Sequence, residues 1–176
     1  MIENLNSKLD SHENLTDEEM THAINLMMEG EIEQHLIEHF LLGLNKKGIT
    51  VREISSAAKV MREKSLKFDL KDSNIIDTCG TGGTGLHTFN CSTASAIVAT
   101  AAGAKVSKHG NRGISSKSGS ADFLVEAGAN INHEREQLAE IFNKVGFVFL
   151  FAPLHHLSMK HVMPARQNLA TKTIFN

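Results

Sequence analysis

The chain has 176 residues, 41% of them hydrophobic, and a formal net charge of -2 from 20 acidic and 18 basic residues. This composition excludes a disordered chain and fits one or two globular domains. We expect no nucleic-acid or membrane partner, because the charge is close to neutral and no apolar stretch is long enough to span a bilayer. Two cysteines are too few for a disulfide framework, so we expect a reduced, cytoplasmic protein. The polar N-terminus is not a signal peptide.

The first 70 residues have patterns typical of helices only. Thr16 and Glu19 have the spacing of a capping box at the start of one helix. A second helix is predicted over residues 33–46, and Thr50 is predicted to cap a third. Three short helices bury little surface by themselves. We therefore expect residues 1–70 to form a helical domain that packs on a second copy or on the rest of the chain.

From residue 71 on, strand and helix patterns alternate. Strands are predicted at residues 75–77, 104–107, 147–151 and 173–175, and helices at 92–102, 120–127, 134–145 and 156–169. This alternation predicts a parallel sheet with right-handed crossovers, and hence an α/β domain over residues 71–176. The last predicted strand has no helix after it, so we expect this domain to be truncated, and the chain to be a fragment.

A glycine-rich loop follows the first predicted strand. Gly80, Gly82, Gly83 and Gly85 let the backbone approach a ligand, and consecutive N–H groups can bind an anion. The loop matches the dinucleotide-binding pattern, but the next helix begins seven residues later and the second strand leads to Lys108 instead of an acid. The lysine of a P-loop is also missing. The loop therefore predicts a site for a phosphate ligand that is neither of these two.

Two further segments offer groups that bind phosphate. Residues 90–93, Asn-Cys-Ser-Thr, precede an alanine-rich helix, and could form an ordinary N-cap or an anion site at the helix N-terminus. Residues 108–112, Lys-His-Gly-Asn-Arg, follow the second strand and supply two cations, an imidazole and an amide. In a parallel sheet this segment lies beside the glycine-rich loop, which favours a site over a solvated turn.

Residues 35–39, His-Leu-Ile-Glu-His, match an inverted zinc-protease motif. At about 100° per residue, His35, Glu38 and His39 fall opposite the apolar stripe of their helix. A solvated helix face explains them, and no third ligand is evident. We expect no zinc.

The motifs occur in the order seen in one known family. They are residues 77–83, 90–93, 108–112, 116–122 and 151–156, followed by Arg166. With these motifs the chain resembles the anthranilate phosphoribosyltransferases over about residues 15–176. The resemblance implies a small helical domain, expected to form a homodimer, followed by an α/β domain of the nucleoside phosphorylase/phosphoribosyltransferase type. It implies transfer of the phosphoribosyl group from phosphoribosyl pyrophosphate (PRPP) to anthranilate in tryptophan biosynthesis, with Mg²⁺.

The resemblance also assigns site residues. PRPP would contact Gly80, Gly82, Gly83, Thr88, Asn90, Ser92, Thr93, Lys108 and Ser120, and anthranilate would contact Gly80, His109, Asn111, His156 and Arg166. Ser92 would also lie near magnesium, and Arg166 would bind the carboxylate of anthranilate. No catalytic base is assigned, because an aromatic amine is already unprotonated near neutral pH and orientation can suffice.

Two departures from the family pattern leave an alternative open. Thr84 stands where the family usually has an aspartate, and the Asp-Glu pair that binds metal in the family is absent from these residues. We therefore expect the chain alone to be inactive. The alternative is a non-catalytic member of the same fold that binds a ligand or nucleic acid. Arg166, Asn111 and the acidic net charge oppose that alternative.

Overall fold

A computed structural model describes residues 1–67, 69–80, 89–113, 118–169 and 171–175. The chain divides into two compact units, a helical unit of residues 1–66 and 156–176 and a sheet unit of residues 67–155. The predicted fold class, helices followed by a parallel α/β domain, is confirmed. Residues 156–176, which the sequence assigns to the second domain, pack with the helices here. None of the described helices has the length and apolar character needed to cross a membrane.

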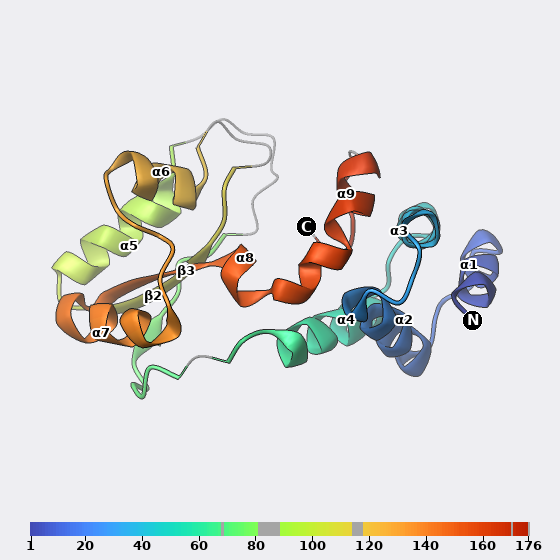
Figure 1. Cartoon of the computed structure of the whole chain (residues 1–176), viewed down its shortest axis with the longest axis horizontal. Helices are drawn as coiled ribbons and strands as arrows, with labels where there is room; N and C mark the ends of the chain where they lie inside the picture. Colours follow the sequence, from blue (N-terminus) through green and yellow to red (C-terminus); the bar gives the residue numbers. More distant parts are fainter. Residues whose placement is uncertain (68, 81–88, 114–117, 170, 176) are drawn as a thin grey trace. The chain divides into compact units, whose positions relative to one another are not determined.

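The helical unit begins with four α-helices (Figure 1). They are α1 (Ile2–Asp10), α2 (Asp17–Glu29), α3 (Gln34–Lys47) and α4 (Val51–Lys64). The predicted capping box is present, because the Thr16 side chain accepts from the N–H of Glu19 while the Glu19 carboxylate accepts from Thr16. Gly30 ends α2 with a φ of 80°, which glycine adopts without strain. The sequence analysis missed α1, although Ile2, Leu5 and Leu9 have helical spacing and are buried.

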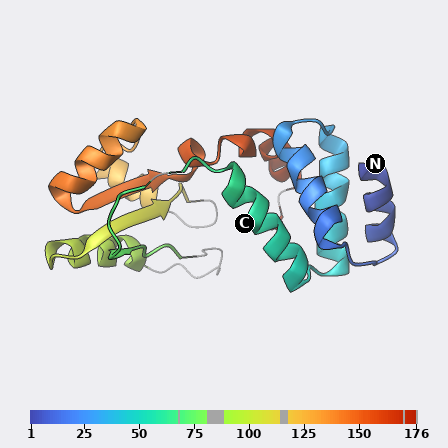
Figure 2. The ribbon, with the colours of Figure 1, turned by 90° about the horizontal axis from the view of Figure 1, so that it is seen from below.

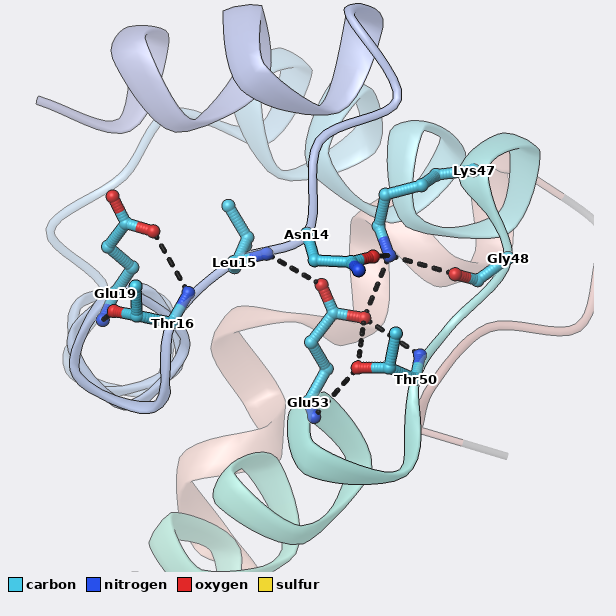
Figure 3. Close-up of polar contacts among 8 residues, drawn as sticks. All are labelled: Asn14, Leu15, Thr16, Glu19, Lys47, Gly48, Thr50 and Glu53. Carbon is cyan, nitrogen blue, oxygen red and sulfur yellow. Dashed lines mark hydrogen bonds and ion pairs between the residues drawn. The ribbon is translucent and has the colours of Figure 1, made fainter.

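A buried ion pair joins three segments of the helical unit (Figure 3). Lys47 Nζ lies 2.8 Å from Glu53 Oε2, with side-chain exposures of 2% and 0%. Glu53 also accepts from the backbone N–H groups of Leu15 at 2.9 Å and Thr50 at 2.8 Å, and Lys47 also donates to Asn14 at 3.0 Å. Burial raises the pKa of Glu53, but these hydrogen bonds outweigh it and leave the pKa below its usual value. The pair therefore fixes the α1–α2 loop against the end of α3 and the start of α4.

The C-terminal segment differs from its prediction in two places. The single helix predicted over 156–169 is wrong, because the structure has a 3₁₀ helix, η1 (Leu157–His161), and a separate α9 (Met163–Leu169). Pro164 has no N–H for a continuous helix, which explains the break. The predicted strand at 173–175 is also wrong. Residues 174–175 form a turn, and Phe175 is buried in the core of the helical unit. An apolar side chain can be buried against helices just as it can in a sheet, so its hydrophobicity alone does not indicate a strand.

The sheet unit is a parallel sheet in the order β1-β2-β3. Its elements are β1 (Ile75–Ile76), α5 (Cys91–Ala101), β2 (Lys105–Gly110), α6 (Ser120–Glu126), α7 (Arg135–Val145), β3 (Phe147–Phe151) and α8 (Ala152–His155). Alternate side chains of β3 face opposite ways: Phe149 packs with Leu124 of α6, and Val148 packs with Phe142 of α7. Figures 1 and 2 show α5 and α7 on opposite faces of the sheet. Because the strands are parallel, their carboxyl ends meet at one edge.

Candidate functional site

The segments that follow β1 and β2 are tied together at this edge. Asp77, directly after β1, accepts a hydrogen bond from the backbone N–H of Cys79 at 2.9 Å through Oδ1. The same oxygen accepts from the backbone N–H of His109, in β2, at 3.3 Å. One carboxylate oxygen therefore fixes the start of the glycine-rich loop beside the predicted phosphate-binding segment of β2.

Lys108 is buried within this edge, with 2% of its surface exposed. A lysine at the end of a predicted strand is expected to be exposed, and that expectation is wrong here, because the Lys108 side chain lies on the covered face of β2. Its Nζ donates to the Thr78 hydroxyl at 3.2 Å, and that hydroxyl donates to the Ser92 carbonyl at 2.8 Å. In the described part of the chain, Lys108 forms no ion pair. A buried ammonium with one neutral partner needs an anion, and here it lies where parallel sheets bind ligands.

The N-terminus of α5 lies next to this lysine. Asn90 caps the helix, because its side-chain oxygen accepts from the N–H of Thr93 at 3.3 Å. Thr93 is 1% exposed, and its hydroxyl has no hydrogen-bond partner among the described residues. A Cβ placed on Gly80 would lie 3.5 Å from the Ser92 hydroxyl, so the loop begins against the helix. The ordinary cap is thus present, and the capped helix also carries a buried hydroxyl that has no partner in the described part of the chain.

The described residues can contribute only a small part of a metal site. They contain no group of three or more His, Cys, Asp or Glu side chains that could bind a metal ion. Ser92 offers one hydroxyl oxygen. Magnesium commonly keeps several waters and binds through one or two protein oxygens together with substrate phosphates. The residues present therefore fit a magnesium ion carried on a phosphate group, with Ser92 as a protein ligand.

His109 and Cys79 face each other without forming an activated nucleophile. The Cys79 sulfur lies 3.9 Å from His109 Nδ1. Burial raises the pKa of the Cys79 thiol, and Asp77 raises it further. Burial also lowers the pKa of His109 below its usual value, although Asp77 acts in the opposite direction. Both groups are therefore neutral near pH 7, which excludes the thiolate–imidazolium pair of a cysteine hydrolase.

The segment after β2 crosses the start of α6 at very short range. The Asn111 carbonyl accepts from the Ser120 hydroxyl at 3.3 Å and from the Ala121 N–H at 3.2 Å. A Cβ on Gly119 would lie 2.2 Å from the backbone nitrogen of Gly113, so only glycine fits there. The crossing therefore brings two predicted site residues, Asn111 and Ser120, together.

Sequence reasoning gave no role to Asp122, which fastens this crossing. Its carboxylate accepts from the backbone N–H groups of Gly113 at 2.8 Å and Gly119 at 2.9 Å, and from Arg112 at 3.2 Å. The hydrogen bonds from Gly113 and Gly119 lower the pKa of Asp122. The signal that could have identified it is its place three residues after Gly119, the spacing of a helix cap.

Arg166 and His156 belong to the helical unit and are described there alone. Arg166, on α9, is half-buried, and its guanidinium donates a hydrogen bond to the Met163 sulfur at 3.5 Å. Burial lowers the pKa of Arg166, and it forms no ion pair within the described ranges. A half-buried guanidinium of this kind can bind a carboxylate through two parallel hydrogen bonds.

Several predicted residues lie outside the described part of the chain. They are Gly82, Gly83 and Thr88 of the predicted PRPP site, together with Thr84, Ser116 and Lys117. The structure therefore brings together Gly80, Asn90, Ser92, Thr93 and Lys108 near the ends of β1 and β2 and the start of α5. It places His109, Asn111 and Ser120 on adjoining backbone.

Two family models match the chain along most of its length. One, described as "Glycosyl transferase family, a/b domain", matches residues 72–176, and another, described as the helical bundle domain of the same family, matches residues 3–65. The chain belongs to this glycosyl transferase family. The two matched ranges fall on either side of the boundary that the sequence pattern predicts near residue 70.

Curated relatives in this family carry the name that the sequence motifs suggested. The chain is 49% identical over 173 residues to the anthranilate phosphoribosyltransferase of Hydrogenovibrio crunogenus, covering 98% of this chain and 51% of that protein. It is 47% identical over 176 residues to that of Thermoanaerobacter sp., covering 100% and 52%. The resemblance is thereby confirmed. The chain spans about half the length of these relatives.

Solved structures of the same name have the same fold over this span. The Thermus thermophilus enzyme matches with a TM-score of 0.86 and 36% identity, over 97% of this chain and 52% of that one. The Saccharomyces cerevisiae enzyme in complex with PRPP and Mg matches with a TM-score of 0.89 and 28% identity, over 99% and 52%.

Proposed function

We propose that this chain forms the PRPP- and anthranilate-binding part of an anthranilate phosphoribosyltransferase of tryptophan biosynthesis. The observation that carries the proposal is the buried ammonium of Lys108, whose described partner is a neutral hydroxyl, together with the buried, unpartnered hydroxyl of Thr93 in the first turn of α5. Two such groups at the carboxyl edge of a parallel sheet favour a phosphorylated ligand. The yeast relative in complex with PRPP and Mg supports the choice of ligand.

In the proposed reaction, the bond from the anomeric carbon to pyrophosphate breaks and a carbon–nitrogen bond to anthranilate forms. The amine releases its proton to solvent, and pyrophosphate leaves with the charge that develops on its oxygen. Lys108 and the backbone N–H groups at the start of α5 would stabilise that charge from fixed positions. Ser92 would help to hold magnesium here, which when bound supplies further neutralisation of the same charge. Ser120, Asn90 and Gly80 would complete the contacts to PRPP.

For anthranilate, we propose that Arg166 binds the carboxylate. Asn111, His109, His156 and Gly80 would contact the rest of the molecule. A neutral His109 suits this role, because its imidazole nitrogen can accept a hydrogen bond from the attacking amine. A yeast relative in complex with 4-fluoroanthranilate supports binding of this class of compound. We also propose a homodimer through the helical unit, which sedimentation of the purified protein would test.

The experiment that tests the function uses a hybrid protein. Residues 1–176 replace the matched 173 residues of the Hydrogenovibrio crunogenus relative, so that the half absent from this chain is supplied. Purified hybrid is mixed with anthranilate, PRPP and Mg²⁺, and the loss of anthranilate fluorescence is followed. We expect turnover that requires both PRPP and Mg²⁺. The 176-residue chain alone, run in parallel, is expected to bind PRPP without turnover.

Two results would contradict the proposal. A folded hybrid that binds neither substrate would show that these residues do not form the substrate site. A folded hybrid that binds PRPP but does not turn over anthranilate would favour the non-catalytic alternative. The parent relative provides the positive control for the assay, and circular dichroism establishes that the hybrid is folded.

A further inference from the structure

Helix α3 contacts the C-terminal segment through polar side chains spaced along its length. Gln34, at the first position of α3, donates through Nε2 to the His161 carbonyl at 2.9 Å and accepts through Oε1 from the Ala165 N–H at 3.1 Å. Further along, Glu38 accepts from Asn168 at 2.8 Å, and Asn45 donates to the Lys172 carbonyl at 2.6 Å. Of these three side chains, only Gln34 contacts the backbone on both sides of the turn that leads into α9.

The Ala165 N–H is a group that helix geometry leaves without a partner. Ala165 is the third residue of α9, and the first N–H groups of a helix have no acceptor within it. Pro164, which precedes it, has no N–H at all. Gln34 therefore supplies a cap from 131 residues away in sequence, where most helices use a side chain of their own N-cap. Ala165 itself is fully buried, so water does not replace this acceptor without cost.

His161, whose carbonyl accepts from Gln34, is also held in place. The His161 ring lies against Gly30, where an added Cβ would come within 2.6 Å of Nδ1. Gly30 ends α2 with a φ of 80°, so both its conformation and the space beside it require glycine. Gln34 thus links the start of α9 to His161, whose ring packs against the end of α2. The residue directly after the capped Ala165 is Arg166, whose N–H continues the helix to Val162 at 3.1 Å.

We propose that Gln34 is a positioning residue that sets the place of Arg166, and through it the selectivity for an aromatic amine bearing a carboxylate. The inference rests on the proposed function of Arg166. Gln34 itself lies outside the residues assigned to either substrate. A bidentate contact to a carboxylate is sensitive to small displacements, because both hydrogen bonds must stay aligned. Loss of the cap at Ala165 therefore weakens the use of anthranilate and leaves the use of PRPP unchanged.

The test measures KM for each substrate in the hybrid protein. Gln34→Ala is expected to raise KM for anthranilate by about 5- to 20-fold, in line with the loss of one helix cap, and to change KM for PRPP less than about twofold. Asn45→Ala is the matched control, since it removes a hydrogen bond from the same helix to the same segment beyond α9. That control is expected to leave both KM values unchanged. Gln34→Glu, which keeps the acceptor for the Ala165 N–H, is expected to be affected less than Gln34→Ala.

A double substitution separates positioning from general destabilisation. If Gln34 acts through Arg166, Gln34→Ala has no further effect on KM for anthranilate once Arg166 is replaced by alanine. An effect of the same size in both backgrounds would overturn the proposal. Amide exchange of the 176-residue chain gives a readout without activity, because Gln34→Ala should reduce protection at Ala165 and Arg166. Unchanged protection there would also overturn it.

The failure of this inference is distinguishable from failure of the proposed function. An unsubstituted hybrid that does not use anthranilate would contradict the function itself. An active hybrid in which Gln34→Ala leaves KM for anthranilate unchanged would contradict only the role of Gln34.

Discussion

Replacing Lys108 by methionine should separate ligand binding from stability. Methionine keeps most of the volume of the lysine stem, so the change removes the ammonium from a site with 2% exposure without opening a large cavity. The lost hydrogen bond to Thr78 costs about 1 kcal/mol, whereas burying an ion with incomplete compensation costs several kcal/mol. We therefore expect Lys108→Met to raise the free energy of unfolding by about 1–3 kcal/mol, because the relieved burial cost exceeds the lost bond.

The same change should weaken pyrophosphate binding. A hydrogen bond to a charged group contributes about 1.5–3 kcal/mol, which corresponds to about a 10- to 150-fold loss of affinity. Thermal melting of the 176-residue chain should show a midpoint raised by about 2–12 °C, at about 2–4 °C for each kcal/mol in a protein of this size. Calorimetric titration with magnesium pyrophosphate gives the affinity. A lowered midpoint together with unchanged pyrophosphate affinity would refute the reasoning and make Lys108 a structural residue.

Three further predictions concern the crossing at α6, the ion pair of the helical unit and the imidazole at the site. Gly119→Ala should lower the free energy of unfolding by more than about 2 kcal/mol in a urea titration, because its Cβ would overlap backbone atoms. The control Gly80→Ala, where the nearest atom is 3.5 Å from the added Cβ, should lower it by less than about 1 kcal/mol. Equal losses for the two variants would contradict the close crossing. Lys47→Ala should cost about 3–5 kcal/mol, because Glu53 would remain buried and charged, while the exposed pair partner Lys144→Ala should cost less than about 1 kcal/mol. Because the pKa of His109 is lowered on folding, the unfolded chain binds this proton more readily; the contribution of neutral His109 to stability is complete above pH 6.5 and declines below it. In an NMR titration, Asp77→Asn should lower the pKa of His109 further, and an unchanged value would show that Asp77 does not act on the ring.

The features predicted correctly from sequence are those set by neighbouring residues. The capping box of Thr16 and Glu19 depends only on two residues three positions apart, so it can be recognised in the sequence, and it is present in the structure. The strand at 147–151 is apolar on both faces, and helices cover both faces in the fold. The helix over 135–145 likewise follows its apolar spacing.

The features that the sequence did not predict depend on which segment, distant along the chain, packs over a residue. The apolar residues at 173–175 fit a strand or a buried turn equally well, and the helical unit decides the outcome. Lys108 shares the buried face of β2 with Val106, but a lysine between polar neighbours gives no local sign of burial, so its burial could not be known before the covering elements were placed. Gln34 and Ala165 are joined over 131 positions, a contact with no local pattern. Long-range packing therefore supplies the part of the site that sequence spacing does not.

The most direct test of the central claim compares two substitutions in the hybrid protein with both substrates. The account predicts that Lys108→Met raises KM for PRPP by at least about 10-fold with less than about a twofold change for anthranilate, and that Arg166→Ala does the reverse. This crossed pattern would assign the phosphorylated donor to the sheet edge and the carboxylate acceptor to α9. Equal effects of either substitution on both substrates would contradict the assignment of separate binding roles to these two cations.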